Sequence, residues 1–152
     1  MEITGLEVNT INKKAEILKA YMNENNINVF VTEELKDEHQ TVIFRSVIQA
    51  ESVNLPTLIV TDDTPFTILR VRVAESVIKE NNKLAMLEYL NNLNRMYKIL
   101  KYYILEDNTL ILDACILSQP DTIDCELVKG TLDLLVNTIV PEYKKVMKTV
   151  WA

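Results

Sequence analysis

Few of the residues that most often carry catalysis occur in this chain. Its 152 residues include one histidine, two glycines and two cysteines. Gly5 and Gly130 are too isolated to build a loop that cradles a phosphate, and no nucleotide-binding, zinc or nucleophile-elbow pattern occurs. His39 lies in a polar turn, which gives histidine neither the positioned partner nor the sheltered site that catalysis needs. We therefore expect a protein that is not an enzyme and has no catalytic residues.

Sites for metals, cofactors and disulfides are not indicated either. The adjacent acids at 33–34 and 62–63 are not a convincing metal or acid–base pair, because neighbours on a strand point to opposite faces and acids in a turn stay solvated. Cys115 and Cys125 lack metal-ligand spacing and are too few for a disulfide scaffold. We interpret them as small, buried or half-buried thiols, and we expect no cofactor and no metal.

Long hydrophobic runs and an excess of positive charge are missing as well. No stretch approaches the roughly 18 to 20 apolar residues of a membrane-spanning helix, and an acid stands where a secretory signal would need bases. Sixteen basic residues against 22 acidic ones give a net charge of −6, which would repel nucleic acid or an anionic membrane. We expect a soluble, cytoplasmic protein that binds neither nucleic acid nor a membrane. We also expect it to fold as a single domain over residues 1–152.

Hydrophobic spacing at every three or four residues predicts three helices. The first runs from residue 10 to the asparagine cluster at 23–26, and Asn9 or Thr10 can cap it. The second covers residues 82–97. The third follows a helix-start signal at 120–124 and is either one long helix kinked at Pro141 or two consecutive helices. The apolar side predicted for the second helix consists of Leu84, Met86, Leu87, Leu90, Leu93 and Tyr97.

Alternating polar and apolar residues predict six strands. The segments are 27–32, 41–48, 57–61, 66–73, 100–105 and 110–117. The connections are short, with turns at 33–38, 62–65 and 106–109, which favours antiparallel hairpins over crossover helices. The order is α-ββββ-α-ββ-α, and the fold class is therefore α+β with an antiparallel sheet.

Two asparagines of the second predicted helix lie next to its leucines. Asn94 falls between Leu87 and Leu90 on the helical wheel, and Asn91 lies beside Leu84. An amide among leucines must find hydrogen-bond partners or cost roughly 1 to 3 kcal/mol. We expect Asn94 to bind backbone groups at a strand end or in a loop, and Asn91 is a second candidate for such bonds.

Two of the predicted strands carry apolar residues on both faces. A sheet covered on one side only normally shows cleaner polar alternation on its other side. Something is therefore expected to cover the second face: the last helix, the same sheet of a second subunit, or a bound peptide. The candidate partner-binding surface consists of Ile43, Arg45, Val47, Phe66, Ile68, Arg70 and Arg72.

A second apolar patch is predicted on the last helix, opposite its main stripe. Leu127 and Leu134 lie seven residues apart and are joined by Thr131 and Thr138. Two interpretations stay open for this patch. The helix is wedged between two parts of its own domain, or the patch is a contact between the subunits of a dimer.

One helix motif and the hairpin after it resemble a known family. The motif is Leu90-Asn91-Asn92-Leu93-Asn94, and the hairpin covers residues 105–114. With the order of elements, they resemble the YbjN family of bacterial sensory transduction regulators, which is similar in fold to type III secretion chaperones. The resemblance covers roughly residues 11–143. It implies a small, acidic α+β domain, often dimeric, with no catalytic residues. Asn108 stands where relatives often have glycine.

Two functions are compatible with these features. The first is a non-enzymatic interaction module, homodimeric, that binds a protein or peptide segment in the manner of a secretion chaperone. The second is a small-molecule sensor, or an uncharacterised enzyme, with a pocket between sheet and helices in which Arg70 and Arg72 recognise an anion.

Overall fold

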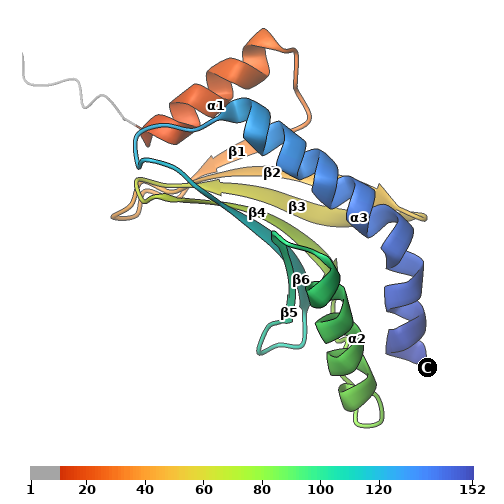
Figure 1. The fold of residues 1–152 in the computed structure, drawn as a ribbon. Coiled ribbons are helices and arrows are strands. Elements are labelled where there is room, and N and C mark those ends of the chain that lie inside the picture. The colour runs from red at the N-terminus through yellow and green to blue at the C-terminus, as the bar shows by residue number, and fades with distance from the viewer. Residues whose placement is uncertain (1–10) are drawn as a thin grey trace, which may run out of the picture.

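The computed structural model describes residues 11–152, which form three helices and one antiparallel sheet (Figure 1). In chain order the elements are α1 (Lys13–Glu24), β1 (Val31–Glu34), β2 (Val42–Ala50), β3 (Val53–Thr61), β4 (Phe66–Ala74), α2 (Lys83–Met96), β5 (Leu100–Ile104), β6 (Leu110–Leu117) and α3 (Cys125–Trp151). The order α-ββββ-α-ββ-α and the α+β class predicted from the sequence are confirmed.

The six strands form one sheet in the order β1-β2-β3-β4-β6-β5, and every neighbouring pair is antiparallel. Alternate side chains of each strand therefore point to the same face. One face is buried under the three helices, as the burial of Phe44, Ile59, Leu69 and Leu112 shows. Figure 1 shows α1 and α3 over β1 to β4 and α2 beside β5 and β6. The core lies between this face and the helices.

The first helix begins at a cap that the sequence analysis did not name. Asn12 precedes α1, and its side-chain oxygen accepts a hydrogen bond of 2.8 Å from the amide of Ala15. The same side chain donates to Gln40 O and to Thr61 Oγ1, at 2.9 and 3.2 Å. The caps predicted at Asn9 and Thr10 lie outside the described residues. Asn12 therefore fixes the start of α1 to the end of the sheet.

Two strand boundaries differ from the prediction. β1 covers Val31–Glu34 instead of 27–32, so Glu33 belongs to a strand and not to an acidic turn; its carboxylate accepts from Arg45 Nε at 2.7 Å. β3 begins at Val53, four residues before the predicted start, and includes Pro56. Proline is tolerated there because β3 pairs with β4 only from Thr57 onward, so Pro56 has a strand on one side only.

The buried side of α2 is narrower than predicted. Met86, Leu90 and Leu93 are buried, whereas Leu84 and Leu87 are exposed. At about 100° per residue the three buried side chains fall within an arc of about 60°, and Leu84 and Leu87 lie outside it. A helix on a sheet buries only the arc that faces the strands, which is why two leucines of the broad predicted side remain in contact with solvent.

Asn94 makes the hydrogen bonds that were predicted for it. Its Nδ2 donates to Tyr102 O at 2.9 Å, and its Oδ1 accepts from Tyr102 N at 2.7 Å. The amide thus pairs with both backbone groups of one residue of β5, an edge strand, and fixes α2 to the sheet. Asn91 is exposed beside Leu84, on the side of α2 that does not face the sheet, so the expectation for Asn91 is wrong.

The last helix is continuous. α3 runs through Pro141, and Asp124 caps its start by accepting from the amide of Leu127 at 3.1 Å. This settles the alternative of two consecutive helices, and Figure 1 shows a bend along the single helix. The main apolar stripe predicted for α3 faces the sheet; its buried members are Val128, Leu135, Ile139, Tyr143, Val146 and Val150.

Candidate functional site

The face of the sheet that points away from the helices is not covered by any helix of the described chain. We call it the open face. Its central side chains are Ile43, Arg45 and Val47 of β2, Leu58 and Val60 of β3, Phe66, Ile68, Arg70 and Arg72 of β4, Asp113, Cys115 and Leu117 of β6, and Lys101 and Tyr103 of β5. All seven residues of the predicted partner-binding surface lie on it.

Large apolar side chains of the open face are in contact with solvent. Val47, Phe66 and Leu117 are 56%, 50% and 69% exposed, and Ile43 and Ile68 are half-buried. One of the predicted covers, the last helix, is therefore wrong for this face: α3 packs its buried stripe against the opposite side of the sheet, since all three helices share that side. Residues 11–152 of a single chain therefore leave the open face without a helical layer.

Cross-strand pairing joins the apolar residues into a band. Ile43 lies opposite Val60, Val60 opposite Ile68, and Ile68 opposite Cys115, so one row crosses four strands. At the end of β4, Phe66 lies opposite Leu117. Directly opposite side chains are about 4.5 to 5.5 Å apart at Cβ, close enough to form one surface. The exposed thiol of Cys115 corrects the expectation that it is buried or half-buried.

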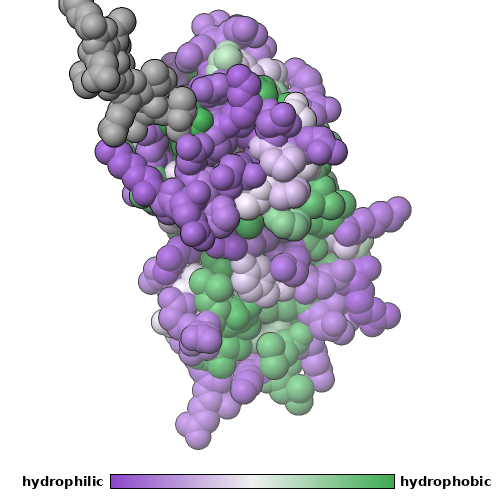
Figure 2. Space-filling view, turned by 90° about the vertical axis from the view of Figure 1, so that its left-hand side faces the viewer, coloured by the Kyte–Doolittle hydropathy of each residue, from purple (hydrophilic) through white to green (hydrophobic). Residues whose placement is uncertain are grey.

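Figure 2 views the molecule from the left of Figure 1 and shows where apolar side chains reach the surface. Polar residues dominate the upper half of this view, and hydrophobic ones gather in the lower half, the level at which β5, β6 and α2 lie in Figure 1. The described surface is also hollowed here: the β3–β4 turn, β4, β5 and β6 enclose a depression lined by Phe66, Ile68 and Ile99 among others.

A closed polar network lies in the middle of the open face. Arg70 donates from Nε and Nη2 to the two carboxylate oxygens of Asp113, both at 2.8 Å. Tyr103 donates to Asp113 Oδ2 at 2.7 Å and accepts from Arg70 Nη2 at 2.7 Å. Asp113 is buried although it lies on this face. The bidentate pair satisfies the carboxylate, and it uses the Nε and Nη2 donors of the guanidinium, the edge that would otherwise bind an anion.

The electrostatics of this network favour its present protonation states. The hydrogen bond with Asp113 raises the pKa of Arg70, and burial raises the pKa of the Tyr103 hydroxyl, helped by its bond to Asp113. Arg70 therefore stays charged and Tyr103 stays a donor at neutral pH. Arg72 also has an acidic neighbour, Glu75, at 3.1 Å. Both arginines that the sequence offered for anion recognition are thus ion-paired.

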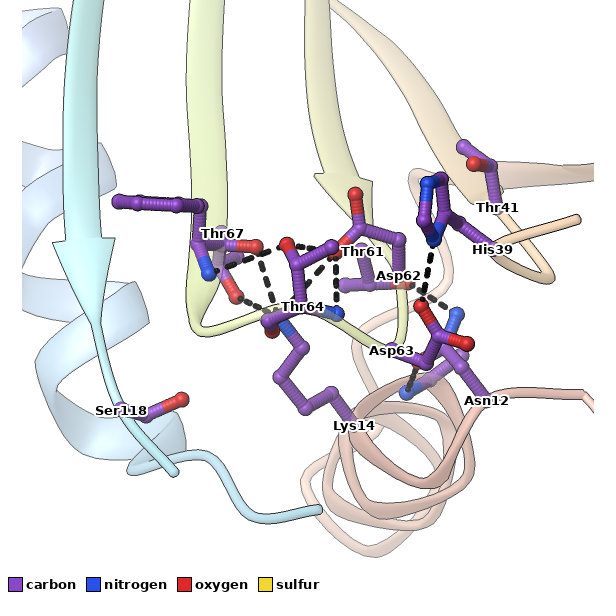
Figure 3. Close-up of polar contacts among 12 residues, drawn as sticks. Asn12, Lys14, His39, Thr41, Thr61, Asp62, Asp63, Thr64, Thr67 and Ser118 are labelled. Carbon is purple, nitrogen blue, oxygen red and sulfur yellow. Dashed lines mark hydrogen bonds and ion pairs between the residues drawn. The ribbon is translucent and has the colours of Figure 1, made fainter. Parts of the chain in front are cut away.

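A second polar cluster lies at the end of the sheet and surrounds a buried lysine (Figure 3). Lys14 of α1 is 0% exposed. Its Nζ donates to Thr64 O at 2.8 Å, Phe66 O at 2.7 Å and Thr67 Oγ1 at 3.1 Å, and it lies 3.8 Å from Asp62 Oδ1. Burial lowers the pKa of Lys14, and Asp62 opposes that effect. All three ammonium donors have acceptors, so this cluster is a fixed joint between α1 and the β3–β4 turn.

The sequence analysis passed over Lys14. A signal for it was nonetheless present, because Lys14 precedes Leu18 by four residues and Met22 by eight and so falls within the apolar stripe of the first helix. A charged residue inside such a stripe must be paired when it is buried. Asp113 gives a comparable signal: it interrupts the apolar run of β6 and is buried.

His39 has a partner, in contrast to the expectation. Its Nδ1 lies 3.0 Å from Asp63 Oδ1, and its Nε2 lies 3.3 Å from Glu38 Oε1 (Figure 3 shows the first contact). The imidazole ring is exposed, and it joins the turn before β2 to the turn between β3 and β4. The hydrogen bond with Asp63 raises the pKa of His39 above its ordinary value of 6.5.

We expect this pKa to depend on Asp63. Because the folded-state pKa exceeds the unfolded one, protonated His39 stabilises the fold at pH values below about 6.5, and the contribution is lost as the pH rises through the raised pKa. An NMR titration of Asp63→Asn should show the pKa of His39 moving back toward 6.5, with a smaller change in Glu38→Gln. An unchanged value in Asp63→Asn would contradict the assignment of Asp63 as the main partner.

Only half of the patch predicted on the last helix reaches the surface. Leu127 and Leu134 are 51% and 40% exposed, whereas Thr131 and Thr138 are buried. Thr131 donates to Leu127 O at 2.7 Å, which satisfies its hydroxyl within the helix. Thr131 and Thr138 therefore belong to the packed side of α3, and the exposed patch consists of the two leucines.

Comparison with known proteins finds no protein family and no curated protein that matches this chain. Within residues 11–152, no helix has the length and hydropathy needed to cross a membrane. The same residues contain no group of three or more histidine, cysteine, aspartate or glutamate side chains placed to hold a metal ion.

Proposed function

We propose that the chain is a non-enzymatic binding module whose open face takes up an apolar segment of another protein. The observation that carries this proposal is that all three helices lie on one side of the sheet, while the other side exposes Val47, Phe66 and Leu117. Phe66 and Leu117 belong to the apolar band, whereas Val47 lies apart from it, beyond Arg45. Contiguous apolar surface such as this band, bordered by polar residues, is typical of sites that bind protein segments. A cytoplasmic location is part of the proposal, and fractionation of cells that contain the tagged chain tests it.

The charges of the open face favour an apolar, uncharged occupant. Arg70 is neutralised by Asp113, Arg45 by Glu33 and Arg72 by Glu75. An anionic ligand that bound one of these arginines would have to displace its carboxylate, and displacing Asp113 would also leave Tyr103 without its acceptor. A neutral apolar segment has no such cost, since it contacts the band beside the network. This argument favours the binding module over the anion sensor.

The proposal is tested with peptides of about ten residues, long enough to cross the sheet. Peptides selected from a random library on the parent chain should be rich in apolar residues. Their affinity for Phe66→Asp should fall by about tenfold or more, since a charge in an apolar contact removes a large share of binding energy. Leu84→Asp, which changes a more exposed apolar residue on α2 (70% against 50%), is the matched control and should bind normally. Failure to select any peptide, or equal binding by Phe66→Asp, would contradict the proposal.

We also propose that the chain is a homodimer and that Leu127 and Leu134 of α3 form the contact between subunits. The two leucines lie on the same side of the helix, and their exposure supports a contact between copies of this patch. The resemblance to the YbjN family, which the order of elements supports, also implies a dimer.

Light scattering at tens of micromolar should give a mass near twice the 17.5 kDa of one chain. Leu134→Glu should reduce this mass to that of a monomer, because two carboxylates would then meet across the two-fold axis without partners. Leu87→Glu on α2 should remain dimeric. A parent chain that is monomeric throughout this concentration range would contradict the proposal of a homodimer. It would not affect the proposal that the open face binds a protein segment.

A further inference from the structure

A cavity lies on the helical side of the sheet, between α1 and the N-terminal half of α3. It has a volume of about 280 Å³ and is open to solvent on one side. α1 contributes Leu18 and Met22 to its lining, the segment after α1 contributes Ile27 and Phe30, and α3 contributes Leu132 and Val136. The lining is mostly apolar, so the cavity differs from the polar centre of the open face; it lies on the other side of the sheet and reaches Val47 at the edge of β2.

Two small residues on adjacent strands explain why this cavity exists. Ser46 of β2 lies directly opposite Thr57 of β3, and both line the cavity. The next pairs on the same face are larger, Phe44 with Ile59 and Ile48 with Leu55. A pair of small side chains between two pairs of large ones leaves a depression in the surface on which the helices pack.

Thr57 on the floor of the cavity needs no polar group from a ligand. The hydroxyl of Thr57 donates to Leu55 O at 3.0 Å and is therefore already satisfied. Apolar cavities of about 150 Å³ exclude water and take up small hydrocarbons. The present cavity is larger, and its volume corresponds to about nine groups of roughly 30 Å³ each, the share of one water molecule in the liquid and close to that of a methylene.

The mouth of the cavity has one ion pair and one hydrogen bond from a neutral hydroxyl to a carboxylate. Lys129 Nζ lies 3.0 Å from Asp133 Oδ2, and Tyr21 donates to Glu126 Oε1 at 2.9 Å. All of these contacts are exposed. Such a rim tolerates the polar end of an amphiphile in water, and the Glu126 carboxylate gives it a net negative charge that favours a neutral head group over an anionic one.

From the volume, the lining and the mouth, we infer that this cavity is a binding site for a single aliphatic chain of about eight carbons, whose polar end stays in solvent. The site does not rest on the function proposed for the open face, because the two lie on opposite sides of the sheet and share only Val47. The chemistry of the chain is shared by a free fatty acid and a neutral alcohol, and the experiment includes both.

The experiment uses the full chain with isotope-labelled isoleucine methyl groups. Octanoate and 1-octanol are titrated separately, below the concentration at which either forms aggregates. The methyl signals of Ile27, Ile48 and Ile59, which line the cavity, should shift and saturate with at least one of the two ligands. The signals of Ile43 and Ile68 on the open face should not move. Shifts confined to Ile43 and Ile68, or no saturable shift with either ligand, would overturn the inference.

A variant that fills the cavity separates loss of binding from loss of structure. Ser46→Leu places an apolar side chain on the floor, so it should weaken binding by at least about tenfold and raise the melting temperature. Gln49→Leu makes the same kind of change at an exposed position of the same strand and should bind as the parent does. Unchanged binding by a folded Ser46→Leu variant would contradict the assignment of the site to this cavity.

Discussion

Replacing Lys14 by methionine should lower the free energy of unfolding by about 3 kcal/mol. The substitution keeps the aliphatic stem in place and removes the ammonium group. Thr64 O, Phe66 O and Thr67 Oγ1 then lose a donor at a site that water cannot reach without a structural change. Each unsatisfied buried polar group costs roughly 1 to 3 kcal/mol, and part of that cost is offset because the ammonium no longer has to be desolvated.

Urea unfolding measures this effect directly, and a domain of this size should melt roughly 6 to 12 °C lower for a loss of about 3 kcal/mol. Lys13→Met is the control. Lys13 is adjacent in sequence and exposed, and it forms only a surface ion pair with Glu16, so its loss should change stability by less than about 0.5 kcal/mol. If Lys14→Met were as stable as the parent, burying the ammonium would cost as much as its hydrogen bonds contribute, and Lys14 would not be the joint between α1 and the sheet.

The second large effect is expected at Asp113. Asp113→Ala removes the acceptor of three hydrogen bonds, two from Arg70 and one from Tyr103. We expect a loss of about 2 kcal/mol, below the roughly 3 to 5 kcal/mol for breaking a fully buried pair, because Arg70 is still 32% exposed and water replaces part of the interaction. Asp113→Asn keeps one acceptor oxygen and should cost about half as much.

A double-mutant cycle shows whether this loss belongs to the pair. Combining Asp113→Ala with Arg70→Met should be less destabilising than the sum of the two single changes, because the second substitution removes the charge that the first leaves without a partner. Glu75→Ala, which breaks the exposed pair with Arg72, serves as the control and should cost less than about 0.5 kcal/mol. Additive losses at Asp113 and Arg70 would contradict a coupled network.

The elements of this fold could be predicted because the local pattern and the final environment agree. The strand at 66–73 alternates in burial as a half-buried sheet requires, the apolar run at 110–117 matches a strand whose first five residues are all buried, and the stripe of the last helix matches its buried side. The hydrogen bonds of Asn94 could be predicted for a similar reason. An amide among leucines has to pair with a backbone group, and Tyr102 of β5 supplies both its carbonyl and its amide.

What could not be predicted depends on contacts between distant segments. Nothing local to β4 indicates that its second neighbour is β6, and this pairing is what brings Arg70 to Asp113. The width of the buried side of α2 depends on how that helix lies on the sheet, so Leu84 was assigned to the wrong environment. The cavity between α1 and α3 likewise follows from the register that places Ser46 opposite Thr57.

The central claim is that the open face, and not the helical side, takes up an apolar protein segment. The most direct measurement maps a selected peptide onto the isoleucine methyl signals of the full chain. The account predicts that Ile43, Ile68 and Ile99, which lie on the open face or line its depression, shift and saturate together, while Ile48, Ile59 and Ile116 of the helical side stay unchanged. Shifts of Ile48, Ile59 and Ile116 without movement of Ile43 and Ile68 would contradict it.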